Sequence, residues 1–324
     1  MKLYIIGNGF DLHHGLRTSY YAFAAYLRDN NRELYDILES FVSYPTSEKD
    51  LWSLFESNLA NLDAEAILSD NADYLPDLGS EDFRDRDRYT FTDVLMRIKQ
   101  LLTEGLLQIF RDFILSVDYP KNVWDHKVEL DINALFLTFN YTDTLEKVYG
   151  IDSSHVTYIH NCAKSDCEYL VLGHGIDPEN FKEDLPEPPV GLTADELQDW
   201  YEENRPYDMS YDDGKDAIMD YFFRMYKPTT EIIKQNHSFF SNLRGVNEIY
   251  VFGHSLSEVD LPYFIEIIKH VKSVQWTVSI HTVSQADFYK NTLLDLGVQE
   301  ENIKIIRLTD LMVDKAQQRL EFDD

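Results

Sequence analysis

The sequence predicts an α/β fold, with a mainly parallel sheet, helices on both faces and a large helical insertion after the first strand. Short apolar runs alternate with helical stretches over much of the chain, which is typical of a parallel sheet covered on both faces. Between the first two strands lies a long block with only helical periodicity. The 324 residues, 44% of them apolar, are enough for a sizeable core.

The first strand is predicted at residues 2–6, where an apolar run ends in Gly7-Asn8-Gly9. Glycines at such a turn let the backbone approach a pyrophosphate closely, so the turn indicates a nucleotide site in a Rossmann-like sheet. The next glycine is Gly15, so the full Gly-x-Gly-x-x-Gly motif is absent. An ordinary strand-to-helix turn is therefore the alternative.

The helical block has apolar residues three and four positions apart. Helices are predicted at residues 19–29, 32–42, 49–62 and 92–116, and a charged loop at 78–88. The chain is accordingly divided into a Rossmann-like nucleotide-binding core, residues 1–18 and 131–324, and a helical insertion, residues 19–130.

The strand pattern returns after the insertion. Further strands are predicted at residues 134–139, 156–160, 169–172, 248–252, 276–281 and 304–308. Residues 177–214 are acidic and proline-rich, which predicts a long loop near the sheet's end with one short helix at 194–204. Such a loop is either a lid or a surface excursion without a role.

Polar residues follow the predicted strand at 134–139, namely Asn140, Thr142 and Asp143. Open α/β sheets bind ligands at the carboxyl ends of their strands, so these side chains are candidate ligand contacts. The alternative is that Asn140 and Thr142 only cap the helix that follows.

Two histidines, His160 and His174, come at the ends of the next two predicted strands. A histidine there can act as a general base, because its ordinary pKa lies near neutrality; a hydrogen-bonded loop histidine is the alternative. Cys162 and Cys167 lie between them, but the spacing matches no familiar zinc pattern, so no metal is expected.

The strand at 248–252 runs into Gly253-His254-Ser255. This resembles the Gly-x-Ser-x-Gly nucleophile elbow of α/β-hydrolases, with Ser257 in place of the last glycine. A triad also needs an acid and a histidine downstream, and Asp260 is the one aspartate between Ser255 and His270. A Ser-dependent hydrolase is therefore the less favoured interpretation.

The charge balance bounds the possible partners. The chain has 58 acidic and 29 basic side chains, a formal net charge of −29 that disfavours direct contact with nucleic acid and anionic membranes. No signal peptide and no apolar run long enough to cross a bilayer are visible, and two cysteines do not form a disulfide scaffold. We expect a cytoplasmic protein without membrane contact.

Taken together, these segments resemble the bacterial abortive-infection AbiH family. The matching pieces are Ile6-Gly7-Asn8-Gly9-Phe10-Asp11-Leu12, His14-Gly15-Leu16, Thr18-Ser19-Tyr20, residues 52–56, Phe139-Asn140-Tyr141-Thr142, Ile159-His160, Gly173-His174-Gly175, and Gly253-His254-Ser255-Leu256 through Asp260. They follow one another over nearly the whole chain.

More distantly, the same order is similar to that of sirtuin-type NAD-binding proteins. The resemblance implies that His160 is the base, that Asn140 and Asp143 flank the nicotinamide ribose, and that Asp11 helps to hold NAD. It further implies nucleotide contacts from Gly7, Gly9, Gly253 and Ser255. Asn8, Thr142, His174 and His254 are further candidate nucleotide contacts. The sirtuin four-cysteine module is missing and Asn161 replaces a glycine after His160, so the resemblance implies NAD hydrolysis rather than protein deacylation.

The resulting expectation is an anti-phage abortive-infection protein that cleaves the bond between nicotinamide and ribose, with NAD as its substrate. A phage or host protein is the expected trigger, and a homo-oligomer is possible. The main alternative, from a different class, is a nucleotide-binding sensor or partner-binding protein that does not turn over its ligand.

Overall fold

The computed structural model describes residues 1–43, 51–164, 169–182, 186–204 and 208–312. The chain divides into two compact units, each built from separate segments. The sheet unit contains Met1–Asn30, Leu107–Gly175 and the chain from Lys227 on, and the helical unit contains Asn31–Leu106 and Ile176–Tyr226. These boundaries differ from those of the predicted insertion, residues 19–130, because residues 19–30 and 107–130 group with the sheet and residues 176–226 group with the helices.

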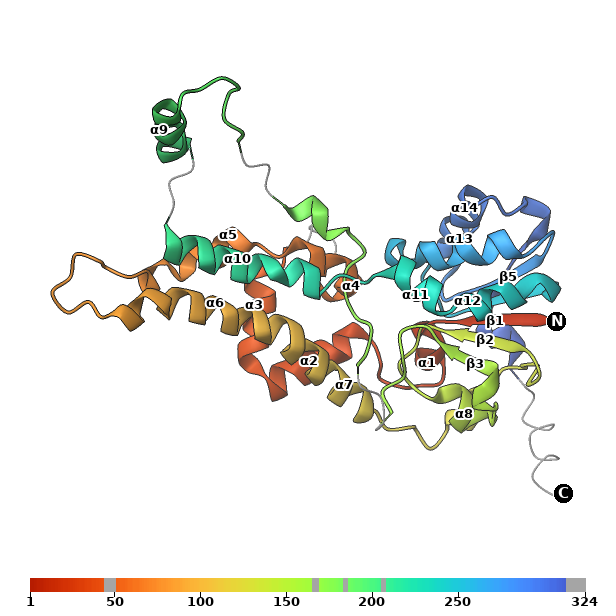
Figure 1. Ribbon diagram of the computed structural model, residues 1–324. Coiled ribbons are helices and arrows are strands. Elements are labelled where there is room, and N and C mark those ends of the chain that lie inside the picture. The colour runs from red at the N-terminus through yellow and green to blue at the C-terminus, as the bar shows by residue number, and fades with distance from the viewer. Residues whose placement is uncertain (44–50, 165–168, 183–185, 205–207, 313–324) are drawn as a thin grey trace. The chain divides into compact units, whose positions relative to one another are not determined.

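The sheet has six strands, all parallel, in the order β3-β2-β1-β4-β5-β6 (Figure 1). The strands are β1 (Lys2–Ile6), β2 (Leu135–Thr138), β3 (Val156–Tyr158), β4 (Glu248–Phe252), β5 (Gln275–Ile280) and β6 (Ile303–Arg307). This order is that of dinucleotide-binding doubly wound folds, in which β1 and β4 are central neighbours. The predicted α/β fold is confirmed.

Alternating side chains of β1 enter two separate cores. Leu3 and Ile5 pack into a cluster with Phe264 and other residues of the helices that follow residue 228, whereas Tyr4 and Ile6 pack with Phe10 and residues of the opposite face. The helices of this unit are α1 (Asn8–His13), α2 (Tyr20–Asn30), α7 (Leu106–Leu115), α8 (Thr144–Tyr149), α11 (Thr229–Gln235), α12 (His237–Ser241), α13 (Leu261–His270) and α14 (Ala286–Asp295). Both faces of the sheet are therefore covered, as predicted.

The helical unit is built around α6, α10 and their neighbours. Its helices are α3 (Arg32–Phe41), α4 (Phe55–Asn58), α5 (Ala64–Asp70), α6 (Thr90–Gln100), α9 (Ala194–Asn204) and α10 (Met209–Arg224). Asn31 and Asp208 cap α3 and α10 by accepting backbone N–H groups of the first turn. Gly214 lets α10 approach α6 closely, since a Cβ there would lie 2.6 Å from the Phe91 ring.

Most predicted elements are found near their expected positions. The predicted helix at 92–116 is continuous from α6 through a π-helical turn, Leu101–Gly105, into α7. None of the described helices is both long and apolar enough to cross a bilayer.

Three predictions about elements are wrong. Residues 169–172 do not form the predicted strand. The Val171 N–H donates to the His160 carbonyl, but the Val171 carbonyl accepts from the Tyr141 hydroxyl rather than from a neighbouring strand. The single helix predicted at residues 49–62 is instead three short helices, Leu51–Leu54, α4 and Leu59–Asn61. The Asn58 side chain donates a hydrogen bond to the Leu51 carbonyl, where a continuous helix would use a backbone N–H; Lys49 lies outside the described residues. The acidic segment 177–214 was predicted as a long loop with one short helix at 194–204; that helix is confirmed, but residues 209–214 form the start of α10, and the described residues of the segment belong to the helical unit.

Candidate functional site

The turns after β1 and β4 are in direct backbone contact. Gly7 and Gly9 donate their N–H groups to the carbonyls of Phe252 and Gly253, at 3.0 and 2.7 Å. A Cβ on Gly7 would lie 2.5 Å from the His254 Cα, and a Cβ on Gly253 would lie 2.1 Å from the Phe10 nitrogen. The structure thus gives these glycines a role in joining the two turns. Direct contact of Gly7 and Gly9 with a nucleotide stays a prediction.

Asp11 is the centre of a hydrogen-bonded group on the adjacent strands. Its carboxyl is 1% exposed and accepts from Thr142 Oγ1 at 2.5 Å and from Thr144 Oγ1 at 2.7 Å. Asp11 lies on α1, directly after β1, whereas the two threonines follow β2 and open α8. The parallel pairing of β1 and β2 therefore brings together residues that are more than a hundred positions apart.

The environment of Asp11 changes its acidity. Burial raises the pKa of this carboxyl from 3.8 to about 6, although hydrogen bonds from Thr142 and Thr144 and the nearby Asn140 amide oppose the rise. A carboxyl with a pKa near 6 can both accept and donate a proton close to neutrality. Such strongly perturbed carboxyl groups are more common at functional sites than elsewhere.

Asn140 follows β2 and is 5% exposed. Its backbone N–H donates to the Thr138 hydroxyl, yet neither Oδ1 nor Nδ2 of its side chain has a hydrogen-bond partner among the described residues. Nearly all buried polar groups in proteins are hydrogen-bonded, because leaving one unpaired costs about 1 to 3 kcal/mol. The Asn140 side chain is therefore suited to a ligand that supplies both a donor and an acceptor.

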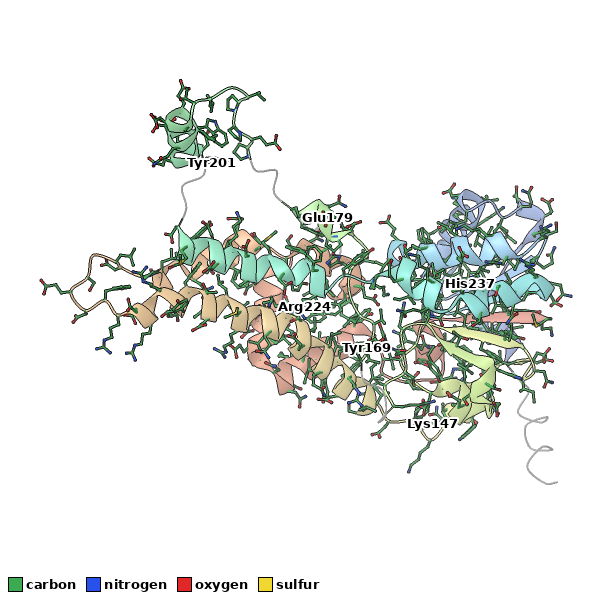
Figure 2. All side chains as sticks on the ribbon, viewed as in Figure 1. Lys147, Tyr169, Glu179, Tyr201, Arg224 and His237 are labelled. Atoms are coloured by element: carbon green, nitrogen blue, oxygen red, sulfur yellow. The ribbon has the colours of Figure 1, made fainter. Side chains whose placement is uncertain are left out.

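Asp143, predicted with Asn140, has other partners in the structure. Its carboxylate accepts from the Tyr119 hydroxyl at 2.9 Å and forms an ion pair at 3.1 Å with Lys147, which projects from α8 (Figure 2). Asn8 is likewise engaged, because its amide exchanges two hydrogen bonds with Thr18. The roles of Asp143 and Asn8 at a ligand stay predictions.

His160 and His254 both lie close to the carboxylate of Asp260, a residue with no predicted role in the NAD site. Asp260, which precedes α13, lies 3.7 Å from His160 Nε2 and 3.5 Å from His254 Nε2. It also accepts from Lys227 Nζ and from Ser257 Oγ, both at 3.1 Å. These five residues, here called the Asp260 cluster, come from the turns after β3 and β4, from the start of α13 and from the segment before α11.

The charges of the Asp260 cluster are buried. The side chain of Lys227 is fully buried and that of Asp260 is 11% exposed. Burial by itself would raise the pKa of Asp260, but Lys227 and the two histidines outweigh it and lower that pKa far below its ordinary value. Burial lowers the pKa of His160 well below 6.5, Lys227 lowers it further, and Asp260 opposes both. His160 is therefore neutral near pH 7.

The tautomer of His254 follows from its backbone contact. His254 Nδ1 accepts from the Leu256 N–H at 2.9 Å, so the proton of the neutral ring lies on Nε2, which faces Asp260. Ser255 is exposed, and none of its hydrogen bonds within the described chain reaches a histidine. The left-handed backbone is at Gly253 and Leu256 rather than at Ser255, so the turn lacks the geometry of a nucleophile elbow.

The remaining predicted residues lie nearby in the sequence but contribute differently. His174 is fully buried, and its carbonyl accepts from the Lys227 N–H at 2.8 Å. Cys162 is half-buried, and Cys167 lies outside the described residues. Over the described ranges no group of three or more His, Cys, Asp or Glu side chains is placed to hold a metal ion.

Sequence reasoning missed several of the residues that complete the site. Thr144, Tyr119 and Lys227 were not predicted, and Asp260 was considered only as the acid of a serine triad. The Asp-Leu-Pro sequence at residues 260–262 is a recognisable helix start, which could have indicated a carboxylate at a helix N-terminus near the sheet. Nothing local indicates that Lys227 is buried.

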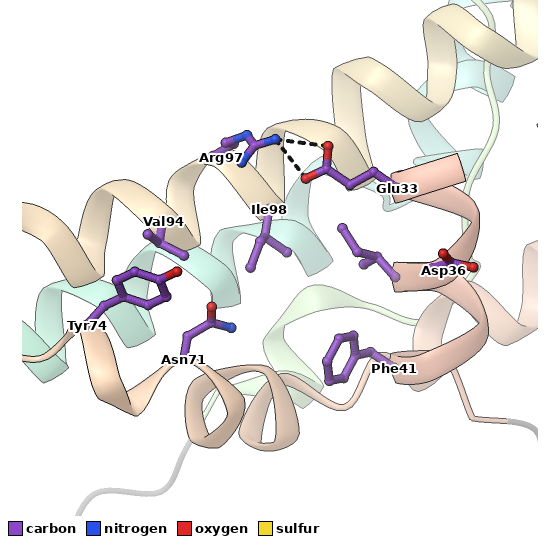
Figure 3. A pocket seen from close by; sticks show the side chains of 9 residues that line it. Glu33, Asp36, Phe41, Asn71, Tyr74, Val94, Arg97 and Ile98 are labelled. Carbon is purple, nitrogen blue, oxygen red and sulfur yellow. Dashed lines mark hydrogen bonds and ion pairs between the residues drawn. The ribbon is translucent and has the colours of Figure 1, made fainter. Parts of the chain in front are cut away.

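The helical unit contains a pocket of its own (Figure 3), with a volume of about 450 Å³. Arg97 donates two hydrogen bonds to Glu33 at its rim, at 2.7 and 2.9 Å, and Phe41 and Ile98 point into the space between the helices. The full lining is Glu33, Asp36, Ile37, Phe41, Asn71, Tyr74, Val94, Arg97 and Ile98. Its lining thus combines apolar side chains with charged and polar ones.

Two chemical features therefore lie at the carboxyl edge of the sheet. One is the Asp11 carboxyl beside the Asn140 amide, and the other is the neutral, buried His160.

The model of a protein family, described as bacteriophage abortive infection AbiH, matches residues 3–280. No curated protein and no solved structure matches the chain.

Proposed function

The chain belongs to the bacteriophage abortive infection AbiH family, and on that premise we propose that it acts in abortive infection by hydrolysing NAD. The reaction breaks the bond between nicotinamide and ribose, water supplies the new oxygen on the sugar, and nicotinamide, ADP-ribose and a proton are released. Loss of NAD halts the infected cell and the phage with it. The family supports the biological role, and the site supports the reaction.

The unpaired amide of Asn140 is the observation that carries the proposal. A buried amide that lies near the Asp11 carboxyl but makes no direct hydrogen bond with the described residues suits a ribose, whose hydroxyl groups both donate and accept hydrogen bonds. The position of Asn140 at the carboxyl end of β2 is where doubly wound sheets bind nucleotides.

Asp11 suits the charge that develops on the sugar. Cleavage of a glycosidic bond passes through a cation resembling an oxocarbenium ion, which a carboxylate in a buried site stabilises. With a pKa of about 6, Asp11 is largely ionised at neutral pH and loses that charge under mildly acidic conditions. Catalysis by Asp11 therefore falls below about pH 6.

His160 supplies the base. It is neutral near pH 7, and its Nε2 has no hydrogen-bond partner among the described residues, so this nitrogen is able to accept a proton from water or from a ribose hydroxyl. The proposed roles of His160 and Asn140 are thus complementary, one accepting a proton and the other holding the sugar.

The test is release of nicotinamide and ADP-ribose from NAD, measured for the purified full-length protein and for cells that carry it during phage infection. Asn140→Ala and His160→Ala are expected to lower release at least 100-fold. Their matched controls, Asn180→Ala and His237→Ala, change exposed residues, the second on α12 (Figure 2), and are expected to keep the wild-type rate.

Each outcome bears on a different part of the proposal. Release by the wild type and both controls, but by neither site variant, supports NAD hydrolysis and its two central residues. Equal loss in a control and a site variant contradicts the assigned roles. If the wild type neither binds nor cleaves NAD in either setting, the proposed reaction is overturned.

A second function is favoured by the pocket of the helical unit. There the chain binds a segment of a phage or host protein without turning over a nucleotide. The apolar side chains Ile37, Phe41, Val94 and Ile98 of the pocket suit an aliphatic side chain of such a segment. The carboxylates Glu33 and Asp36 are already paired with Arg97 and Arg32. Binding of NAD without release of nicotinamide, in both settings of the experiment above, favours this sensor over the enzyme.

A further inference from the structure

The two oxygens of the Asp260 carboxylate serve different partners. Oδ2 accepts from Ser257 Oγ at 3.1 Å and faces His254 Nε2 at 3.5 Å. Oδ1 accepts from Lys227 Nζ at 3.1 Å, and His160 Nε2 lies 3.7 Å from the same oxygen. Lys227 and His160 therefore compete for one oxygen, and Lys227 holds it.

The charges of the cluster balance only while His160 is neutral. Lys227 contributes one positive charge and Asp260 one negative charge, and both are buried. The fixed tautomer of His254 places its N–H toward Oδ2 without adding a charge. A proton on His160 would add a second buried cation beside a single anion, and buried charges without a partner are strongly disfavoured.

We propose that Lys227 is the charge-setting residue of the site: by occupying Asp260 Oδ1, it keeps His160 neutral and its Nε2 available as an acceptor. Without the ammonium group, Asp260 becomes an unpaired buried anion, and protonation of His160 restores the balance. Lys227 thus acts on the reacting atoms through Asp260 and His160, as a positioning residue.

Every titratable group that faces His160 fits this assignment. Asp260 favours its protonated form, whereas Lys227 and His254 disfavour it. The other neighbours are the rings of Tyr141 and Tyr263, with centroids 6.2 and 5.7 Å from that of His160, and the ring of Phe139 at 5.2 Å. Asp260 is therefore the one carboxylate among these groups that can stabilise an imidazolium at His160, and Lys227 already neutralises it.

The inference deepens the proposed function, because only neutral His160 serves as the base, but its test does not depend on NAD cleavage. The test follows the ring nitrogens of isotope-labelled histidine by NMR between pH 5 and 8, in the full-length protein, with His160→Gln to assign the signal. In the wild type, His160 is expected to stay neutral throughout. A protonated His160 at pH 6 in the wild type overturns the inference, whatever the variants do.

Three variants test the charge of Lys227: one removes it alone, one removes it together with the charge of Asp260, and one keeps it. Lys227→Met keeps most of the side-chain volume and is expected to raise the pKa of His160 by more than one pH unit, a tenfold or greater shift toward the protonated form. Lys227→Met combined with Asp260→Asn removes both charges and is expected to return His160 to the neutral form. Lys227→Arg keeps the cation and the wild-type titration.

The paired variants separate charge from packing. A titration of His160 that is the same in Lys227→Met, in the double variant and in the wild type contradicts the inference. If NAD is cleaved and the pKa of His160 in Lys227→Met exceeds that of Asp11, the acid limb of the pH–rate profile moves to higher pH in this variant and moves back in the double variant. If the NMR shifts occur without any NAD cleavage, the charge-setting role stands and the proposed reaction fails.

Discussion

At the scale of single residues, Asp11 is placed where its charge destabilises the fold. The rise of its pKa from 3.8 to about 6 corresponds to about 3 kcal/mol of disfavoured ionisation in a buried position. A residue that served only to hold the two strands together would not need this charge, since its threonine partners are neutral. The cost is understandable if the carboxylate acts on a ligand.

The first prediction concerns the pH dependence that Asp11 imposes. Because the folded carboxyl binds its proton more tightly than the unfolded one, its stabilising contribution is complete below about pH 4 and is lost as the pH rises to about 6. For Asp11→Asn, the free energy of unfolding relative to wild type should therefore increase by about 3 kcal/mol between pH 4 and 7. Chemical denaturation across that range measures it.

The control for this prediction is Asp118→Asn, which removes the same charge from an exposed position of the sheet unit. Its effect on the free energy of unfolding should be within about 0.5 kcal/mol, as is usual for substitutions at exposed positions. Parallel curves for wild type and Asp11→Asn would contradict the raised pKa of Asp11.

The sequence predicted some residues of the site and missed others for a physical reason. Asn140, Thr142 and His160 were predicted because strand ends of a parallel sheet meet at one edge. Lys227 was missed because nothing in the sequence around it distinguishes a buried lysine from a solvated one. Its burial depends on Asp260, thirty-three positions away.

At the scale of elements, the contact between the turns after β1 and β4 determines what Gly253 can tolerate. Gly253 has a φ of +67° and would place a Cβ 2.1 Å from the Phe10 nitrogen. Gly150, at the end of α8, also has a φ of +67° but has nothing within 4 Å of such a Cβ. Both glycines have a left-handed backbone that would strain a residue with a Cβ, and they differ in the space around them.

The second prediction uses this matched pair. Gly150→Ala should lower the free energy of unfolding by about 1 to 2 kcal/mol, the cost of a side chain in the left-handed region. Gly253→Ala adds a backbone clash and should cost about 2 kcal/mol or more beyond that. Urea denaturation compares the two, and equal losses would show that the turns separate without difficulty.

Strands could be predicted where the apolar pattern of a segment agrees with its pairing in the sheet. β1 and β4 are apolar runs whose neighbours on both sides are strands, so their pattern and their pairing agree. Residues 169–172 have a similar pattern but meet the Tyr141 hydroxyl instead of a strand. The sequence pattern of this segment does not reveal that its carbonyl is bound by a side chain rather than by a neighbouring strand.

At the scale of the whole molecule, the helical unit is completed by a distant segment. α10 packs along α6, although more than a hundred residues separate them, and Lys99 of α6 forms an ion pair with Asp220 of α10 at 2.9 Å. The sequence pattern of α10 indicates a helix but not the helix against which it packs. Residues 176–226 were therefore predicted to belong to the Rossmann-like core.

The third prediction tests whether each of the two units unfolds cooperatively and independently of the other. In Gly214→Leu, the new side chain meets the rings and methyl groups of Phe91 and Leu95, so α6 and α10 should lose about 2 kcal/mol of protection against hydrogen exchange. Amide protons of β1 and β4 should keep theirs. Mass spectrometry of exchanged peptides measures both in one sample.

The control is Asp213→Leu, which adds the same side chain at the neighbouring, exposed position of α10. Its exchange should match that of the wild type in both units. A loss of protection that spreads equally to β1 and β4 in Gly214→Leu would mean that the two units unfold as one.

The strand order also governs when the site exists during translation. β1 leaves the ribosome first, but its neighbour β4 begins at Glu248, and Asp260 is made later still. Nascent or prematurely terminated chains that lack these residues have neither the paired turns nor the carboxylate that neutralises Lys227. On the proposed function, a nascent chain that ends before Asp260 is therefore expected to be inactive, because it cannot yet assemble the site.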